Sequence, residues 1–211
     1  MLGLLDTLRQ IQGDGLGWLG LGPTECRYRI AATGARWRLR AYLGATAGPP
    51  LLIVAAPIKR PYIWDLTASV SVVRHCLRSR LPVYLLEWMP PPSHGDRNAG
   101  IVDYATRSIG EAVATVAHEQ GGMRPFIIGH SLGGTLAAIY AAFDPPNIRG
   151  IVLLSTPLCF AAGSCRFRDA IIAMAPPASR PWRLFLVRCY RSSASWQLPI
   201  PFFGRGLSTP R

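Results

Sequence analysis

One pentapeptide near the middle of the chain, Gly-His-Ser-Leu-Gly at residues 129–133, constrains the fold more than any other feature of the sequence. A continuous apolar run at 126–128 precedes it, and a longer apolar run at 136–143 follows it. The first run has the length of a buried strand, and the second has the length of a helix. A serine at a sharp strand-to-helix turn needs glycines beside it, because a Cβ at those positions would clash with neighbouring atoms. The motif therefore predicts a nucleophile elbow with Ser131 at its tip.

The predicted elbow places polar groups where a serine nucleophile needs them. The amino end of a helix behind Ser131 adds positive potential at a developing oxyanion. We expect the backbone amide of Leu132 to be one oxyanion donor, and that of Ile58, in the loop after an apolar run, to be the second. A glycine-rich packing turn with an incidental serine is the alternative, and the strand–helix setting favours the elbow. The other residues of the predicted elbow are Gly129, His130, Gly133 and Gly134.

Apolar runs and helical stretches alternate over much of the chain. Continuous apolar runs are typical of strands buried on both faces, and apolar residues three and four positions apart are typical of helices. Strands are expected at 51–55, 83–87, 126–129 and 151–155, and helices at 65–79, 102–119 and 132–143. Ahead of them, residues 26–42 alternate in polarity around a turn, which predicts an antiparallel hairpin. The predicted fold class is therefore α/β, with a mostly parallel sheet, an N-terminal antiparallel hairpin and helices on both faces.

Arginine dominates the charge of the chain. The formal net charge is +12, and 22 of the 23 basic residues are arginine. Half of the excess lies in residues 178–211, which hold six arginines and no acid. Because this tail has few interleaved aromatic residues and no recognisable binding fold, we expect no nucleic-acid partner. The arginines of the hairpin are interpreted as a solvated strand face, with a binding patch as the alternative. They are Arg27, Arg29, Arg36, Arg38 and Arg40.

The cysteines and the uncharged stretches exclude several classes of protein. Five cysteines at irregular spacing suit neither a disulfide framework nor a zinc site, and their odd number fits free thiols in a reducing, cytoplasmic setting. No phosphate-binding loop is recognisable, and we expect neither a metal nor a cofactor. Residues 125–143 contain no Asp, Glu, Lys or Arg, but they include the Gly-His-Ser turn and change period half-way. A strand followed by a helix explains them better than a membrane span.

The histidines and acids of the chain do not complete a catalytic triad. A serine is weakly nucleophilic until a base, oriented by an acid, accepts its proton. Where a G-x-S-x-G turn carries the serine, the acid and then the histidine follow it in the chain. Every histidine and all but two of the acids precede Ser131, so no triad acid or base is identified. The histidines are His75, His94, His118 and His130, and the two later acids are Asp144 and Asp169. His130 is interpreted as a packing residue, with a role beside the oxyanion as the alternative.

Several short segments between residues 50 and 160 form a series. They are PLLIV at 50–54, RPYIWDL at 60–66, SVVR at 71–74, VYLLEW at 83–88, DY at 103–104, the elbow, and TPLCF at 156–160. This series resembles the polyhydroxyalkanoate synthases, most closely those of class III. That family has the α/β-hydrolase fold and polymerises hydroxyacyl-coenzyme A through a thioester on a cysteine. The resemblance implies this fold and a small acyl ester or acyl-thioester substrate. The family's cysteine aligns with Ser131, and a serine there suits hydrolysis or acyl transfer to water or an alcohol.

The resemblance also implies that part of the family's fold has no counterpart in this sequence, because the family's catalytic Asp and His lie on later segments. We expect a helix and glycine-rich lead at 1–24, an α/β-hydrolase core without its last strands at 25–177, and an Arg/Pro-rich tail at 178–211. A truncated or frame-shifted hydrolase with slow or no turnover is the resulting hypothesis. The alternative is a non-catalytic chain that binds an unlike partner subunit or a polyester granule, since class III synthases work as two unlike subunits.

Overall fold

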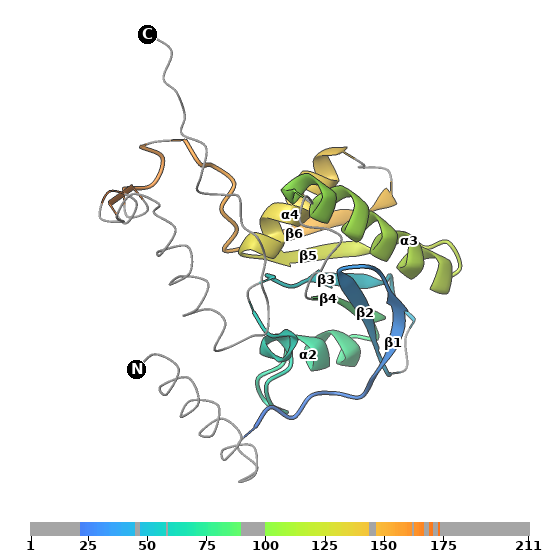
Figure 1. Ribbon diagram of the computed structural model, residues 1–211. Helices are drawn as coiled ribbons and strands as arrows, with labels where there is room; N and C mark the ends of the chain where they lie inside the picture. The colour runs from blue at the N-terminus through green and yellow to red at the C-terminus, as the bar shows by residue number, and fades with distance from the viewer. Residues whose placement is uncertain are drawn as a thin grey trace.

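The structure of the chain is a computed structural model that describes residues 22–44, 47–57, 59–89, 100–143, 147–161, 163–166, 169–170 and 173. Its centre is a six-stranded sheet in the order β1-β2-β4-β3-β5-β6 (Figure 1). The strands are β1 (Tyr28–Thr33), β2 (Trp37–Tyr42), β3 (Leu51–Val54), β4 (Val83–Trp88), β5 (Phe126–His130) and β6 (Gly150–Leu154). The helices are the 3₁₀ turn η1 (Pro61–Trp64), α2 (Val72–Arg78), the π-helical turn η2 (Asp103–Ser108), α3 (Ile109–Glu119) and α4 (Leu132–Phe143).

The sheet is mixed, as the alternation of apolar runs and helices predicts. β3 pairs in parallel with β4 and β5, and β5 pairs in parallel with β6. The hairpin of β1 and β2 is antiparallel and joins the sheet through β4, again antiparallel. The chain passes from each parallel strand to the next through a helix, because parallel neighbours need a crossover. The predicted α/β class, with a parallel sheet and an N-terminal antiparallel hairpin, is confirmed.

Helices cover both faces of the sheet (Figure 1). On one face, α3 and α4 pack on a core that includes Leu52, Leu86 and Ile127. On the other face, α2 packs on a second core that includes Ile53 and Leu85. Neighbouring residues of β3 and β4 point to opposite faces, so these strands must be apolar at nearly every position. This requirement explains the continuous apolar runs in the sequence.

The helix expected at 65–79 begins later than its sequence predicts. α2 starts at Val72, and Ser71 is its N-cap, with a hydroxyl that accepts a hydrogen bond from the Arg74 amide (2.8 Å). Asp65 is completely buried before the helix, and its carboxylate accepts a hydrogen bond from the Ser71 hydroxyl (2.6 Å). The acid therefore serves a tertiary contact and does not open the helix.

Two arginines of the hairpin are buried, one directly before β2 and one within it, so the predicted solvated strand face is wrong for them. Arg36 and Arg40 are 6% and 5% exposed. β2 lies between β1 and β4, and its polar face meets side chains instead of water. Arg38 and Arg40 both donate through Nε to Glu87 on β4 (2.5 and 2.7 Å), and the Arg40 guanidinium lies 4.3 Å from the centre of the Tyr28 ring.

The ends of the chain fall largely outside this description. The lead expected at 1–24 is described only from residue 22 onward, and the tail expected at 178–211 lies outside the described residues. Among the helices that are described, none combines the length and the apolar character that a bilayer span requires.

Candidate active site

Ser131 is the single residue between β5 and α4. β5 ends at His130 and α4 begins at Leu132, so the chain changes from strand to helix within one residue. The φ of Ser131 is 53°, in the left-handed region, which costs a residue with a Cβ roughly 1–3 kcal/mol. The Ser131 amide donates to the carbonyl oxygen of Leu154 at the end of β6 (3.0 Å). The structure thus places Ser131 in a strand-to-helix turn of the kind that its motif predicts.

Three glycines let α4 begin in contact with the strand ends. A Cβ at Gly129 would overlap the Cα of Gly134, and a Cβ at Gly133 would overlap the carbonyl oxygen of Ala55. A Cβ at Gly134 would overlap the side chain of Thr156, which follows β6. The glycines of the motif are therefore required by close approach of the backbone to three neighbouring strands.

The first turn of α4 and the loop after β3 meet beside Ser131. The first hydrogen bond within α4 is the one from the Thr135 amide to the Ser131 carbonyl oxygen (3.1 Å), so the Leu132 amide precedes the helical ladder. Ile58, the second predicted oxyanion donor, lies outside the described residues. The loop after β3 also makes a contact with Trp88 that the sequence did not lead us to expect. The indole Nε1 of Trp88 donates to the carbonyl oxygen of Ala55 (2.7 Å).

The family comparison agrees with this geometry. The family described as alpha/beta hydrolase fold matches residues 66–172, which are half of the chain and include the whole elbow. The chain belongs to the α/β-hydrolase family.

Curated relatives of this α/β-hydrolase include polymerases of hydroxyalkanoates. A poly(3-hydroxyalkanoate) polymerase subunit from Haloferax mediterranei is 39% identical over 111 residues, which are 53% of this chain and 22% of that protein. The subunit from Allochromatium vinosum is 32% identical over 111 residues, which are 53% of this chain and 31% of that protein. The match thus spans less than a third of either relative, and over the matched region it confirms the resemblance to polyhydroxyalkanoate synthases.

A solved structure of an alpha/beta hydrolase enzyme from the sediment metagenome of the Mar Chica lagoon in Morocco superposes with a TM-score of 0.47 at 17% identity. The superposition covers 77% of this chain and 62% of that chain.

Within the described part of this α/β-hydrolase, no imidazole or carboxylate is hydrogen-bonded to the Ser131 hydroxyl. The His130 ring packs edge-on against Trp64, with the ring centroids 6.1 Å apart, and its buried Nδ1 has no hydrogen-bond partner among the described residues. This contact supports the interpretation of His130 as a packing residue.

The other histidines and acids considered as a catalytic base or acid make no described contact with Ser131. His75 and His118 are exposed on α2 and α3, and His94 and Asp144 lie outside the described residues. Asp169 accepts a hydrogen bond from the Gly163 amide (2.7 Å). In the ranges that the structure describes, no group of three or more His, Cys, Asp or Glu residues could hold a metal ion.

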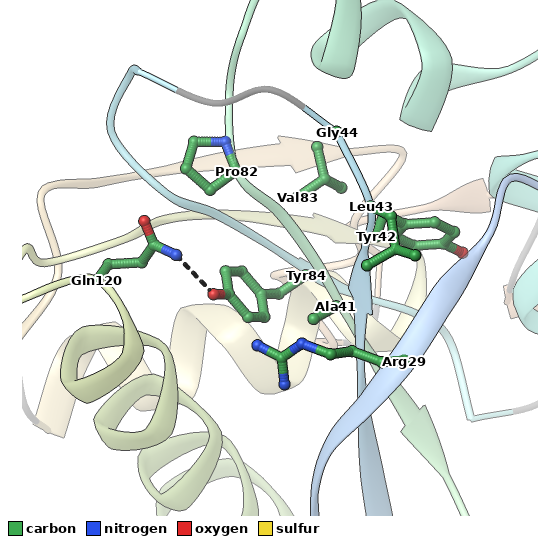
Figure 2. A pocket seen from close by; sticks show the side chains of 9 residues that line it. All are labelled: Arg29, Ala41, Tyr42, Leu43, Gly44, Pro82, Val83, Tyr84 and Gln120. Carbon is green, nitrogen blue, oxygen red and sulfur yellow. Dashed lines mark hydrogen bonds between the residues drawn. The ribbon is translucent and has the colours of Figure 1, made fainter.

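A hollow of about 180 Å³ lies where β4 begins, at the end of the parallel strands that is opposite to Ser131 (Figure 2). Gln120 Nε2 donates to the Tyr84 hydroxyl (2.7 Å), and that hydroxyl donates to the Glu119 carboxylate (2.9 Å). Arg29 donates twice to the same carboxylate (2.9 and 2.6 Å), and its hydrogen bond lowers the pKa of Glu119. Because these polar groups bond to one another and ligand sites are usually larger, we assign the hollow a structural role.

Proposed function

We propose that the chain is an acyl-transfer enzyme in which Ser131 attacks the carbonyl carbon of an acyl ester or acyl thioester. The observation that carries this proposal is the φ of 53° at Ser131 in a one-residue turn between strand and helix. Backbone strain of this kind persists where the surrounding structure enforces it, and it is concentrated at functional sites. The amino end of α4 supports the same role, since the amide of Leu132, together with that of Ile58, would stabilise the oxyanion.

The proposed reaction is a two-step acyl transfer. The Ser131 oxygen forms a bond to the acyl carbon, the bond from that carbon to the alkoxide or thiolate breaks, and the hydroxyl proton goes to the leaving group. The oxygen of water or an alcohol then forms a bond to the acyl carbon, the bond from that carbon to the Ser131 oxygen breaks, and the proton of the attacking group goes to the serine oxygen, which restores the hydroxyl. Since no described imidazole accepts the Ser131 proton, we expect acylation by this chain to be slower than with a complete triad by several powers of ten.

The names of the relatives support one substrate class. They are named as poly(3-hydroxyalkanoate) polymerases, and the resemblance aligns the family's cysteine with Ser131. We infer that Ser131 accepts hydroxyacyl groups from esters or thioesters and delivers them to water or an alcohol. A cytoplasmic setting suits this role, because the exposed thiol of Cys165 forms no disulfide within the described part of the chain.

A fluorophosphonate probe tests the proposal, with hydrolysis of p-nitrophenyl butyrate as a second measurement. Ser131→Ala should abolish labelling. Ser155→Ala is the matched control, because Ser155 also has a positive φ (46°) and directly follows the neighbouring strand β6. It should label at the wild-type rate. Equal labelling of S131A and the wild type would show that Ser131 is not the nucleophile.

Exposed apolar side chains after β6 favour a second candidate function, the binding of a polyester granule or an unlike partner subunit. Leu158 and Phe160 are 58% and 54% exposed and follow the exposed Leu154. Such side chains in a group mark interaction surfaces. Co-sedimentation with poly(3-hydroxybutyrate) particles tests this function. L158S/F160S should lose binding, whereas F143S, which changes an exposed phenylalanine at the end of α4, should retain it.

A further inference from the structure

Trp88 is bonded to the backbone that leaves β3 beside Ser131. Its side chain is buried, at 4% exposure, and its indole Nε1 donates to the Ala55 carbonyl oxygen at 2.7 Å. β3, β4 and β5 run in the same direction, so the end of β4, the segment after β3 and Ser131 share one edge of the sheet. A side chain of β4 thereby holds the loop that faces the elbow.

The Ala55 carbonyl is held from two sides. Gly133, in the first turn of α4, approaches so closely that a Cβ there would overlap the carbonyl oxygen. Residues 55–57 are buried, and the Lys59 amide donates to the Ala56 carbonyl oxygen (2.9 Å), so the chain turns directly after them. Trp88 and α4 therefore clamp this backbone between them. Removal of the indole N–H takes a hydrogen bond from a buried carbonyl group.

Other side chains fix the indole in turn. The Tyr104 ring lies 5.5 Å from that of Trp88, at an interplanar angle of 59°. The Arg36 guanidinium lies 5.2 Å from the centre of the Tyr104 ring. Tyr104 belongs to the π-helical turn η2, and π-helical turns are frequent at functional sites. Packing thus locks the rotamer of Trp88, as a residue that positions an active-site loop requires.

We propose that Trp88 is a positioning residue for the oxyanion side of the active site. Through the Ala55 carbonyl it holds residues 55–57 against the first turn of α4, and the sequence places the expected second oxyanion donor directly after them. The inference rests on the proposed function of Ser131. Trp88 acts on the loop and does not contact the reacting atoms.

Trp37 offers a matched control for Trp88. The two tryptophans lie opposite each other in the pair of β2 and β4, both are 4% exposed, and both belong to the same core. The indole Nε1 of Trp37 donates to Glu111 on α3 (2.9 Å) and not to the loop after β3. W37F and W88F therefore both remove an indole N–H from the same core, but only W88F removes the hydrogen bond that holds the loop after β3.

The test compares the two variants in the full chain. Amide hydrogen exchange at Lys59 reports on the turn after β3, and the rate of fluorophosphonate labelling reports on the oxyanion site. We expect W88F to speed exchange at Lys59 and to slow labelling by about 10- to 100-fold relative to W37F, because small displacements of oxyanion donors have effects of this size. A general loss of stability would change the exchange rate at Lys59 and the labelling rate to the same extent in both variants. Equal exchange at Lys59, or equal labelling rates, would overturn the proposal.

If W88F does not fold, the proposal can be tested on the wild-type chain by NMR. In protein labelled with ¹⁵N-tryptophan, the indole resonance of Trp88 should shift when the probe binds Ser131, and that of Trp37 should not. A Trp88 resonance that does not move contradicts the proposal. If the wild-type chain takes up no probe, the proposed function fails, and exchange at Lys59 in the variants still decides whether Trp88 holds the loop.

Discussion

Ser131 and the glycines around it meet one structural requirement, which is that α4 begins in contact with the ends of three strands. Ser131 carries the strain of a positive φ, and Gly134 lies where a Cβ would overlap Thr156. Gly110 in α3 is a contrast, because a Cβ there would meet only the Tyr140 ring, at an ordinary distance of 3.5 Å. The same added methyl group therefore has opposite effects on stability at the two glycines.

Substitution of the two glycines by alanine tests this requirement. We expect G134A to lower the free energy of unfolding by about 1–3 kcal/mol, as overpacking does. G110A should raise it by about 0.5–1 kcal/mol, because alanine is favoured over glycine inside a helix. Urea denaturation measures both. Thr156→Gly in the G134A background should restore part of the loss. The absence of any such coupling would show that the Thr156 contact is not what excludes the methyl group.

At the scale of elements, an ion-pair network joins β2 to β4. Glu87 on β4 accepts hydrogen bonds from Arg38 and Arg40, which lie on the facing side of β2. Burial by itself would raise the pKa of Glu87, but the hydrogen bonds and charges of the two arginines outweigh it and lower the pKa. The hairpin is thus attached to the parallel strands by buried charge in addition to the backbone ladder.

This network makes stability depend on pH in a defined direction. The pKa of Glu87 in the folded state lies below its unfolded value of about 4.3, so its contribution is complete above that pH and is lost as the pH falls through the folded-state pKa. E87Q removes the charge that Arg38 and Arg40 share and leaves the buried Arg40 with Glu25 as its carboxylate partner (2.8 Å), so it should cost about 2 kcal/mol at pH 7. In urea denaturation, the difference between E87Q and the wild type should narrow toward pH 3.

An exposed pair supplies the comparison for E87Q. Arg107 is 77% exposed in its pair with Glu111, and R107A should cost less than about 0.5 kcal/mol. A difference between E87Q and the wild type that stays constant from pH 7 to pH 3 would contradict the role of the Glu87 charge.

At the scale of the whole molecule, the sequence predicts what each segment buries by itself and fails where burial depends on a distant neighbour. The apolar runs agree with β3 to β6 to within one residue at each end, because these strands are apolar on both faces. The burial of Arg40 in β2 was missed, since an alternating segment has the same pattern whether its polar side meets water or Glu87. The bond of Trp88 to Ala55 joins residues 33 positions apart and depends on β4 lying beside β3. The local sequence pattern of either strand does not predict that the two strands are neighbours.

The segment before β1 is a second example of long-range attachment. Thr24 donates its amide to the Leu66 carbonyl oxygen (2.8 Å), and its own carbonyl oxygen accepts from Arg74 (2.5 Å). The Cys26 amide donates to the buried carboxylate of Asp65, which also accepts from the Ser71 hydroxyl. Asp65 thus ties residues 24–26 to the start of α2, across 39 positions of the sequence.

Asp65→Asn should release this segment. The amide that replaces the carboxylate loses the ion pair with Arg74 (3.3 Å) and turns one acceptor into a donor, so we expect a loss of about 3 kcal/mol in the free energy of unfolding. Limited trypsin digestion should then cut faster after the exposed Arg27. S71A, which removes one donor to Asp65 and the N-cap of α2, should cost about 1 kcal/mol and accelerate the cut less. Cleavage of D65N at the wild-type rate would mean that the bonds of Thr24, and not Asp65, hold the segment on the sheet.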